Sequence, residues 1–188
     1  NIDVSPNDSA DLVTLVPSVN ELVLLKRGRV YRLQGTSPDN FTIVNVVPTT
    51  GSIGCVSTHG AVFALNDVFY VSEGGVHALS ATDRFGDLQE KFLSQRIEPF
   101  FRAGSDDTIS LNRLATTAVL HYDPNFNRLY LLVDTDNDGK NDRLLNYDVA
   151  EGAWSQWPLA STSDETVRYA SLWTVRNSTT GAREVFAG

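Results

Sequence analysis

The sequence has a single cysteine, no methionine and only three histidines among its 188 residues. Because Cys55 is the single cysteine, the chain has no internal disulfide and no cysteine cluster for a metal, and we expect Cys55 to pack as a small apolar residue. No apolar run approaches the ~20 residues that a membrane-spanning helix needs. The histidines, His59, His77 and His121, lie in different repeats and fit no zinc or nucleophile spacing. The sequence therefore predicts a protein that is not an enzyme.

Basic residues are also few. The chain carries 15 Lys and Arg against 23 Asp and Glu, which gives a formal net charge of −8 at pH 7. Phosphate contacts need clustered Lys and Arg, and an acidic surface repels a phosphate backbone. The composition argues against a protein that grips nucleic acid, while a hydrophobic content of 41% is enough for a substantial core.

What the sequence does contain is a repeated pattern of two short apolar segments joined by a polar turn. It occurs at residues 21–33, 67–79 and 128–148, and it begins again at 167–175. Each copy predicts a β-hairpin. Because one hairpin cannot bury both of its faces alone, repeated hairpins must pack on their neighbours.

The spacing of the hairpins indicates the architecture. Val30 and Val76 are 46 positions apart, and Val76 and Leu145 are 69 positions apart. The second interval holds an extra stretch at about residues 86–107, and without it the two intervals become similar. A period in the mid-forties is typical of a four-stranded propeller blade. We therefore predict an all-β fold of the β-propeller type, built of antiparallel hairpin blades.

The expected blades span approximately residues 12–47, 53–82 and 112–157, with an incomplete blade at 167–188. All of them belong to one β-propeller-type segment, residues 1–188. Three to four blades are fewer than a closed propeller usually has. We expect the chain to be part of a larger propeller, and a processed mature domain is the alternative.

The insertion, at approximately residues 87–103, has a different pattern. Its apolar residues recur near helical spacing, with polar residues between them: Leu88, Phe92, Leu93, Ile97, Phe100 and Phe101. This predicts one amphipathic helix, which either contacts a neighbouring subunit or fills the local core. Under the first alternative, Phe92, Phe100 and Phe101 are the candidate interface residues.

One short motif has the residues of a metal site. Asp134, Asp136 and Asp138 alternate ahead of Gly139, and Asp142 follows. Ca²⁺ takes six to eight oxygen ligands, and alternating carboxylates in a tight loop direct oxygens toward one point. The closing Glu of an EF-hand is absent and the flanks are expected strands, so the motif is closer to the short calcium loops of extracellular repeat proteins. The alternative is a solvated hairpin tip, where Asp, Asn and Gly are the usual residues.

The three tryptophans, Trp154, Trp157 and Trp173, also allow two interpretations. They could form a platform on which a sugar ring stacks. At strand positions of a repeating fold, they more often fill the space between sheets.

Four segments of the chain resemble structural proteins of tailed bacteriophages, and more narrowly the β-propeller nozzle or stabilisation proteins at the end of short tails. The segments are Glu21–Gly35, Gly54–Ser57, Asp67–Leu79 and Leu144–Trp157. The resemblance implies a non-catalytic virion protein that assembles as a homo-oligomeric ring, commonly of six, with other tail proteins. Such a ring continues the DNA channel and retains or releases the genome. It also implies that DNA passes without sequence-specific binding, which an acidic wall would favour. The lack of a long apolar run, noted above, argues against a membrane partner.

A second functional class stays open. A secreted β-propeller that binds a glycan or a protein partner would have the same hairpins, and Ca²⁺ at residues 134–142 would stiffen one of its loops. Apart from this Ca²⁺, the sequence implies no cofactor.

Overall fold

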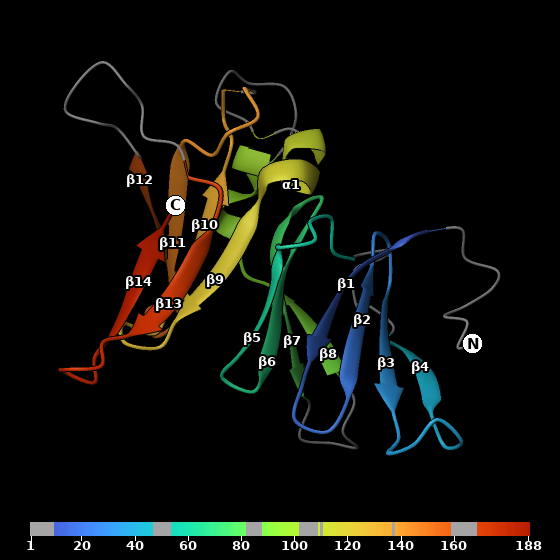
Figure 1. Ribbon diagram of the computed structural model, residues 1–188. Helices are drawn as coiled ribbons and strands as arrows, with labels where there is room; N and C mark the ends of the chain where they lie inside the picture. Colours follow the sequence, from blue (N-terminus) through green and yellow to red (C-terminus); the bar gives the residue numbers. More distant parts are fainter. Residues whose placement is uncertain are drawn as a thin grey trace. The chain divides into compact units, whose positions relative to one another are not determined.

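The computed structural model describes residues 10–46, 54–81, 88–101, 109, 111–136, 138–158 and 169–188 (Figure 1). The chain divides into two compact units, Asn1–Phe92 and Leu93–Gly188. The described residues form three four-stranded antiparallel sheets, one two-stranded sheet and two short helices. Neither of these helices is long and apolar enough to span a membrane.

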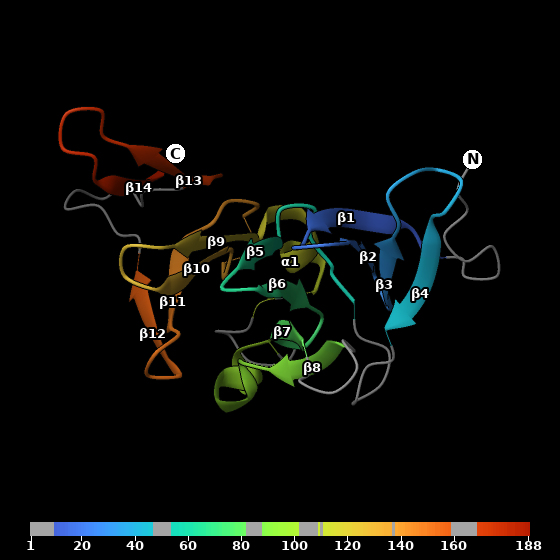
Figure 2. The ribbon, with the colours of Figure 1, turned by 90° about the horizontal axis from the view of Figure 1, so that it is seen from below.

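The first unit contains two of the four-stranded sheets. One consists of β1 (Leu12–Pro17), β2 (Leu22–Lys26), β3 (Val30–Gln34) and β4 (Thr42–Val46). The other consists of β5 (Ala61–Ala64), β6 (Asp67–Ser72), β7 (Gly75–Ala81) and β8 (Leu88–Phe92). In both sheets the strands lie side by side in chain order, as Figure 2 shows for β5 to β8.

The second unit begins with a 3₁₀ helix, η1 (Gln95–Phe101), and a short α-helix, α1 (Leu111–Thr117). The third four-stranded sheet follows, again in chain order: β9 (Val119–Asp123), β10 (Arg128–Val133), β11 (Arg143–Asp148) and β12 (Ala153–Pro158). The last sheet is a hairpin of β13 (Leu172–Arg176) and β14 (Arg183–Ala187).

The expectation of an all-β protein is therefore confirmed in its coarse form, but the expectation of one amphipathic helix in the insertion is wrong. Residues Leu88–Phe92 form a strand, which pairs with β7 from His77↔Phe92 to Ala81↔Leu88. Pairing satisfies the backbone groups of the free edge of β7, and this outweighs the local helical pattern. Only Gln95–Phe101 is helical, with a kink at Ile97 and Pro99 inside. Residues 87, 102 and 103 lie outside the described part.

A second difference concerns the expected blade at 112–157. Its first residues belong to α1, and its first strand begins only at Val119. Two threonines in α1 donate their hydroxyls to carbonyl oxygens one turn earlier, Thr116 to Asn112 at 3.0 Å and Thr117 to Arg113 at 2.9 Å. Blade boundaries 47, 53, 82 and 167 lie outside the described residues.

The second strand of each four-stranded sheet is almost completely buried. β2, β6 and β10 are buried from their second residue onward. Apart from Lys26 at the end of β2 and Ser72 at the end of β6, the buried residues of each strand form an apolar run, such as Leu129–Val133, because both faces of the strand are covered. Each of them also has a hydrogen-bonded strand on either side.

The core of the first unit lies between its two sheets. Its buried residues are Val16, Val23, Leu25, Val30 and Val46 from the first sheet and Cys55, Val68, Tyr70 and Leu79 from the second sheet and the segment before it. The first strands of the two sheets, β1 and β5, contact each other. Cys55 is fully buried within this core, which confirms that it packs as an apolar residue, and burial raises the pKa of its thiol to about 11.

The second unit repeats this contact between first strands. β9 lies against β13, and His121 Nε2 is 2.7 Å from Thr174 Oγ1. Burial lowers the pKa of His121, which favours the neutral ring. In the same unit, Asn141 donates from Nδ2 to the carbonyl oxygens of Thr117 at 3.0 Å and Tyr169 at 2.9 Å.

Gly54 lies against the turn between β2 and β3. A Cβ atom at this position would be 1.9 Å from the Lys26 carbonyl oxygen and 2.7 Å from the Arg29 nitrogen. Both are backbone atoms, which cannot move away by changing a rotamer. This approach, at the start of the segment that leads into the second sheet, leaves no room for a side chain.

We expect Gly54→Ala to lower the free energy of unfolding by about 3 kcal/mol or more, because overpacking here displaces backbone. Gly74→Ala is the matched control, since a Cβ at Gly74 would meet nothing within 4 Å. Urea unfolding of both variants measures the difference. Equal stability of the two variants would contradict the close approach.

His77 lies in a stack of rings in the second sheet. The His77 ring centroid is 4.6 Å from that of Phe92 and 5.6 Å from that of Tyr70, and both pairs are stacked. The residue is 3% exposed. Removal from water lowers the pKa of His77 from 6.5 to about 4, because a charged ring loses its hydration there.

This pKa predicts a loss of stability in acid. Above pH 6.5 both states hold the neutral ring, whereas between pH 6.5 and about 4 the unfolded chain binds a proton that the folded chain does not. Between pH 7 and 4 we expect the wild type to lose up to about 3 kcal/mol more unfolding free energy than His77→Phe, which keeps the ring stack. Urea unfolding at a series of pH values measures this. Parallel pH profiles would refute it.

Candidate functional site

The three histidines lie on different segments of the chain. His77 is on β7, His121 is on β9, and His59 lies in the turn before β5. Among the described Asp, Glu, His and Cys side chains, the one group of three or more whose ligand atoms come close together is formed by Asp134, Asp136 and Asp138. This acidic loop, residues 134–142, joins β10 to β11.

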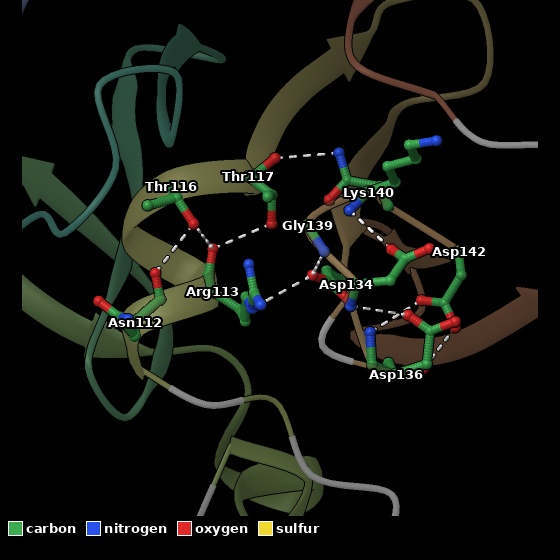
Figure 3. A network of polar contacts seen from close by, with 12 residues as sticks. Asn112, Arg113, Thr116, Thr117, Asp134, Asp136, Gly139, Lys140 and Asp142 are labelled. Carbon is green, nitrogen blue, oxygen red and sulfur yellow. Dashed lines mark hydrogen bonds and ion pairs between the residues drawn. The ribbon is translucent and has the colours of Figure 1, made fainter.

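Asp134 is the inner carboxylate of the loop. It is fully buried, although it follows directly after β10. Its Oδ2 accepts a hydrogen bond from the Gly139 nitrogen at 2.8 Å and lies 3.5 Å from Nε of Arg113 on α1 (Figure 3). A buried carboxylate needs such partners, because burial without them costs several kcal/mol.

The rest of the loop is held by hydrogen bonds from backbone nitrogens to side chains two residues earlier in the sequence. Asp136 accepts from the Asp138 nitrogen at 3.3 Å, and Asp138 accepts from the Lys140 nitrogen at 2.9 Å. Gly139 has φ +89, a conformation that favours glycine, and it brings its N–H toward Asp134. The alternation of Asp with a glycine after it therefore produces a tight turn whose carboxylates converge.

The structure brings together three of the four predicted metal ligands. Oxygen atoms of Asp134, Asp136 and Asp138 lie within 4.8 Å of one another. Asp142 is not part of this group: its two carboxylate oxygens accept from the Thr135 nitrogen at 2.8 Å and from Thr135 Oγ1 at 2.6 Å. Asp142 closes the base of the loop.

Arg113 is the residue of this site that sequence reasoning missed. It comes from α1, in a segment that we expected to begin a strand, and no local pattern links it to the loop. Its guanidinium places one positive charge beside Asp134. A bound cation would therefore have to share the Asp134 carboxylate with Arg113. The loop can therefore hold a hard cation through Asp136, Asp138 and Asp134, against competition from Arg113.

The candidate interface residues do not lie on one helix. Phe92 is half-buried on β8, stacked on His77, and belongs to the first unit. Phe101 is 5% exposed, so it cannot offer a docking surface in the folded unit. Phe100 is half-buried on η1 and contacts Phe101 edge to face at 6.0 Å between centroids. Only Phe100 has a position from which it could contribute to a surface of the second unit.

The tryptophans have different surroundings. Trp154 is half-buried, with its ring centroid 4.9 Å from that of Tyr147. Trp157 is 47% exposed and Trp173 is 42% exposed. Trp154 and Trp157 are three positions apart on β12 and therefore point to opposite faces of its sheet, and Trp173 lies on β13, so the three rings do not share one face.

Comparison with known proteins adds no family to this description, because no protein-family model and no curated protein matches the chain.

The calcium hypothesis makes a definite prediction. We expect millimolar Ca²⁺ to raise the melting temperature of the wild type over its value in chelator, because a ligand that binds only the folded state stabilises it. A dissociation constant of about 0.1 mM would give about 1.4 kcal/mol at 1 mM Ca²⁺. Asp136→Asn keeps the acceptor for the Asp138 nitrogen but removes a charge, and it should abolish the shift. No shift in the melting temperature of the wild type would refute Ca²⁺ binding, and the loop would then be only a hydrogen-bonded turn.

Proposed function

We propose that this protein is a non-enzymatic structural subunit of a bacteriophage tail, in the nozzle or the terminal ring of the tail tube, which forms part of the DNA exit channel and helps to retain or release the genome. The observation that carries the proposal is the repeated sheet: three four-stranded meanders and a further hairpin, each with its strands in chain order. This is the strand order of a propeller blade.

Two features of packing support blades arranged around an axis. In the first unit β1 contacts β5, and in the second unit β9 contacts β13, so the strands that meet are in each case the first strands of successive sheets. Blades that share an axis bring their first strands closest to it. The buried second strands β2, β6 and β10 are the second feature, because packing against a neighbouring sheet removes the faces of a strand from water.

The β13–β14 sheet supports a contact with another subunit. Trp173, Val175 and Phe186 are 42%, 44% and 42% exposed, and Trp173 lies directly opposite Phe186 in the register. In each complete sheet the second strand is buried, whereas β14 is exposed along most of its length. Large exposed apolar side chains gathered on one sheet favour a surface that is covered, either by the rest of its blade or by another subunit in an assembly.

The charge of the chain fits a channel for DNA. A net charge of −8 is consistent with a wall that repels phosphate and would let DNA pass without specific contacts. The proposal implies a homo-oligomeric ring, other tail proteins as partners, and the virion as the location.

Peptide mass spectrometry on density-purified particles tests the location. We expect peptides of this chain at several copies per particle, at a constant ratio to the other tail proteins. Absence from particles, with the protein free in the medium, would refute the phage function.

Assembly is tested by substitution in the exposed sheet. We expect Trp173→Lys to prevent ring formation, because a charge replaces apolar contact area, while circular dichroism still shows the β signal of the wild type. Leu65→Lys is the control, since Leu65 is 51% exposed on the β5–β6 turn. Mass photometry of the three proteins gives the oligomeric state. Rings formed equally by all three would remove this sheet from the interface.

A second candidate function is favoured by the acidic loop: a secreted β-propeller that binds a glycan or a protein partner and is stabilised by Ca²⁺. The convergence of Asp134, Asp136 and Asp138 is the observation in its favour. A calcium-dependent melting temperature together with absence from particles would support it over the tail function.

A further inference from the structure

A groove of about 390 Å³ lies in the second unit, between η1 and the strands β11 and β12. Arg96, Pro99 and Phe100 line it from η1, and Leu145, Trp154 and Gln156 line it from the sheet. This volume is at the small end of the range for ligand sites and has the size of one or two sugar rings. Neither the fold nor the acidic loop requires such a space.

One wall of the groove is a fixed indole. Trp154 Nε1 donates to the Leu93 carbonyl oxygen at 3.0 Å, and Tyr147 packs on the indole with centroids 4.9 Å apart. An aromatic ring that is already immobilised loses little conformational entropy when a ligand packs on it. Its π face attracts the polarised C–H groups of a sugar ring, as it attracts other positive partners.

The groove also carries positive charge in an acidic protein. Arg96 lines it, is exposed, and forms no ion pair within the described part of the chain. Arg143 lies beside it, with its guanidinium carbon 5.9 Å from the Phe100 ring centroid and NH1 donating to Gln156 Oε1 at 3.4 Å. Guanidinium groups bind carboxylates through paired hydrogen bonds. The side-chain nitrogen of Gln156 is a further donor, suited to a hydroxyl.

We propose that this groove binds a sugar ring that carries a carboxylate, of the uronic acid class, with the ring against Trp154 and the carboxylate on Arg96. The aromatic wall selects a ring, and the guanidinium selects the charged sugar over its neutral counterpart. This binding goes beyond the structural role proposed above. It is measured on the isolated protein, so its failure would leave the evidence from particles unchanged.

The test is a titration with glucuronate and with glucose, followed by NMR at the Trp154 indole N–H, which Trp154→Phe identifies. We expect glucuronate to bind at least tenfold more tightly than glucose. Arg96→Gln should remove this preference, so that glucuronate and glucose bind with similar affinity. Arg176→Gln, an exposed arginine on β13 in the same unit, is the matched control and should bind like the wild type.

Three outcomes would overturn the proposal. They are equal affinity for glucose and glucuronate, an Arg96→Gln variant that keeps the preference, and binding of benzoate without binding of glucuronate. The last outcome would assign the groove to planar aromatic acids. Circular dichroism of each variant confirms folding before the titration, so a lost preference reports on Arg96 and not on an unfolded chain.

Discussion

Burial of a single strand on both faces is the constraint on which each complete sheet depends. β2, β6 and β10 consist mostly of apolar residues, and each buried Leu or Val side chain contributes about 1.5–3 kcal/mol when it leaves water. Such a strand needs a hydrogen-bonded neighbour on both edges and packed side chains on both faces. The first and third strands satisfy the edges, and in the first unit the packing of one sheet on the next covers a face.

The sequence predicts these hairpins well because their signal is local. Glu21–Leu33 and Asp67–Leu79 contain both strands and the turn between them, so pairing partners are read directly from the chain. The helix predicted for the insertion was wrong because the deciding interaction there is not local. Whether Leu88–Phe92 becomes helix or strand is decided by the free edge of β7, which a local pattern does not contain. The helix α1 was missed because it is one short segment, Leu-Asn-Arg-Leu-Ala-Thr-Thr, with little periodicity.

The acidic loop shows the same division between local and distant information. The convergence of Asp134, Asp136 and Asp138 follows from their alternation and from the turn at Gly139. The role of Asp142 as a partner of Thr135, and the arrival of Arg113 beside Asp134, depend on how α1 and β10 pack. Tertiary contacts therefore decide which charges lie near the loop. The Arg113 charge beside Asp134 lowers the affinity of the loop for a cation, and by how much depends on this packing.

The chain order of the strands has a consequence for how the protein is made. Every strand in the four described sheets pairs only with the strand just before or just after it, and none is contributed from a distant part of the sequence. The entropy lost in closing each short connection is small, so pairing is fast and does not wait for the rest of the chain. Each sheet can complete its pairing while the ribosome is still synthesising the next one. This shortens the time during which unpaired strand edges, which are prone to aggregation, are exposed in the cell.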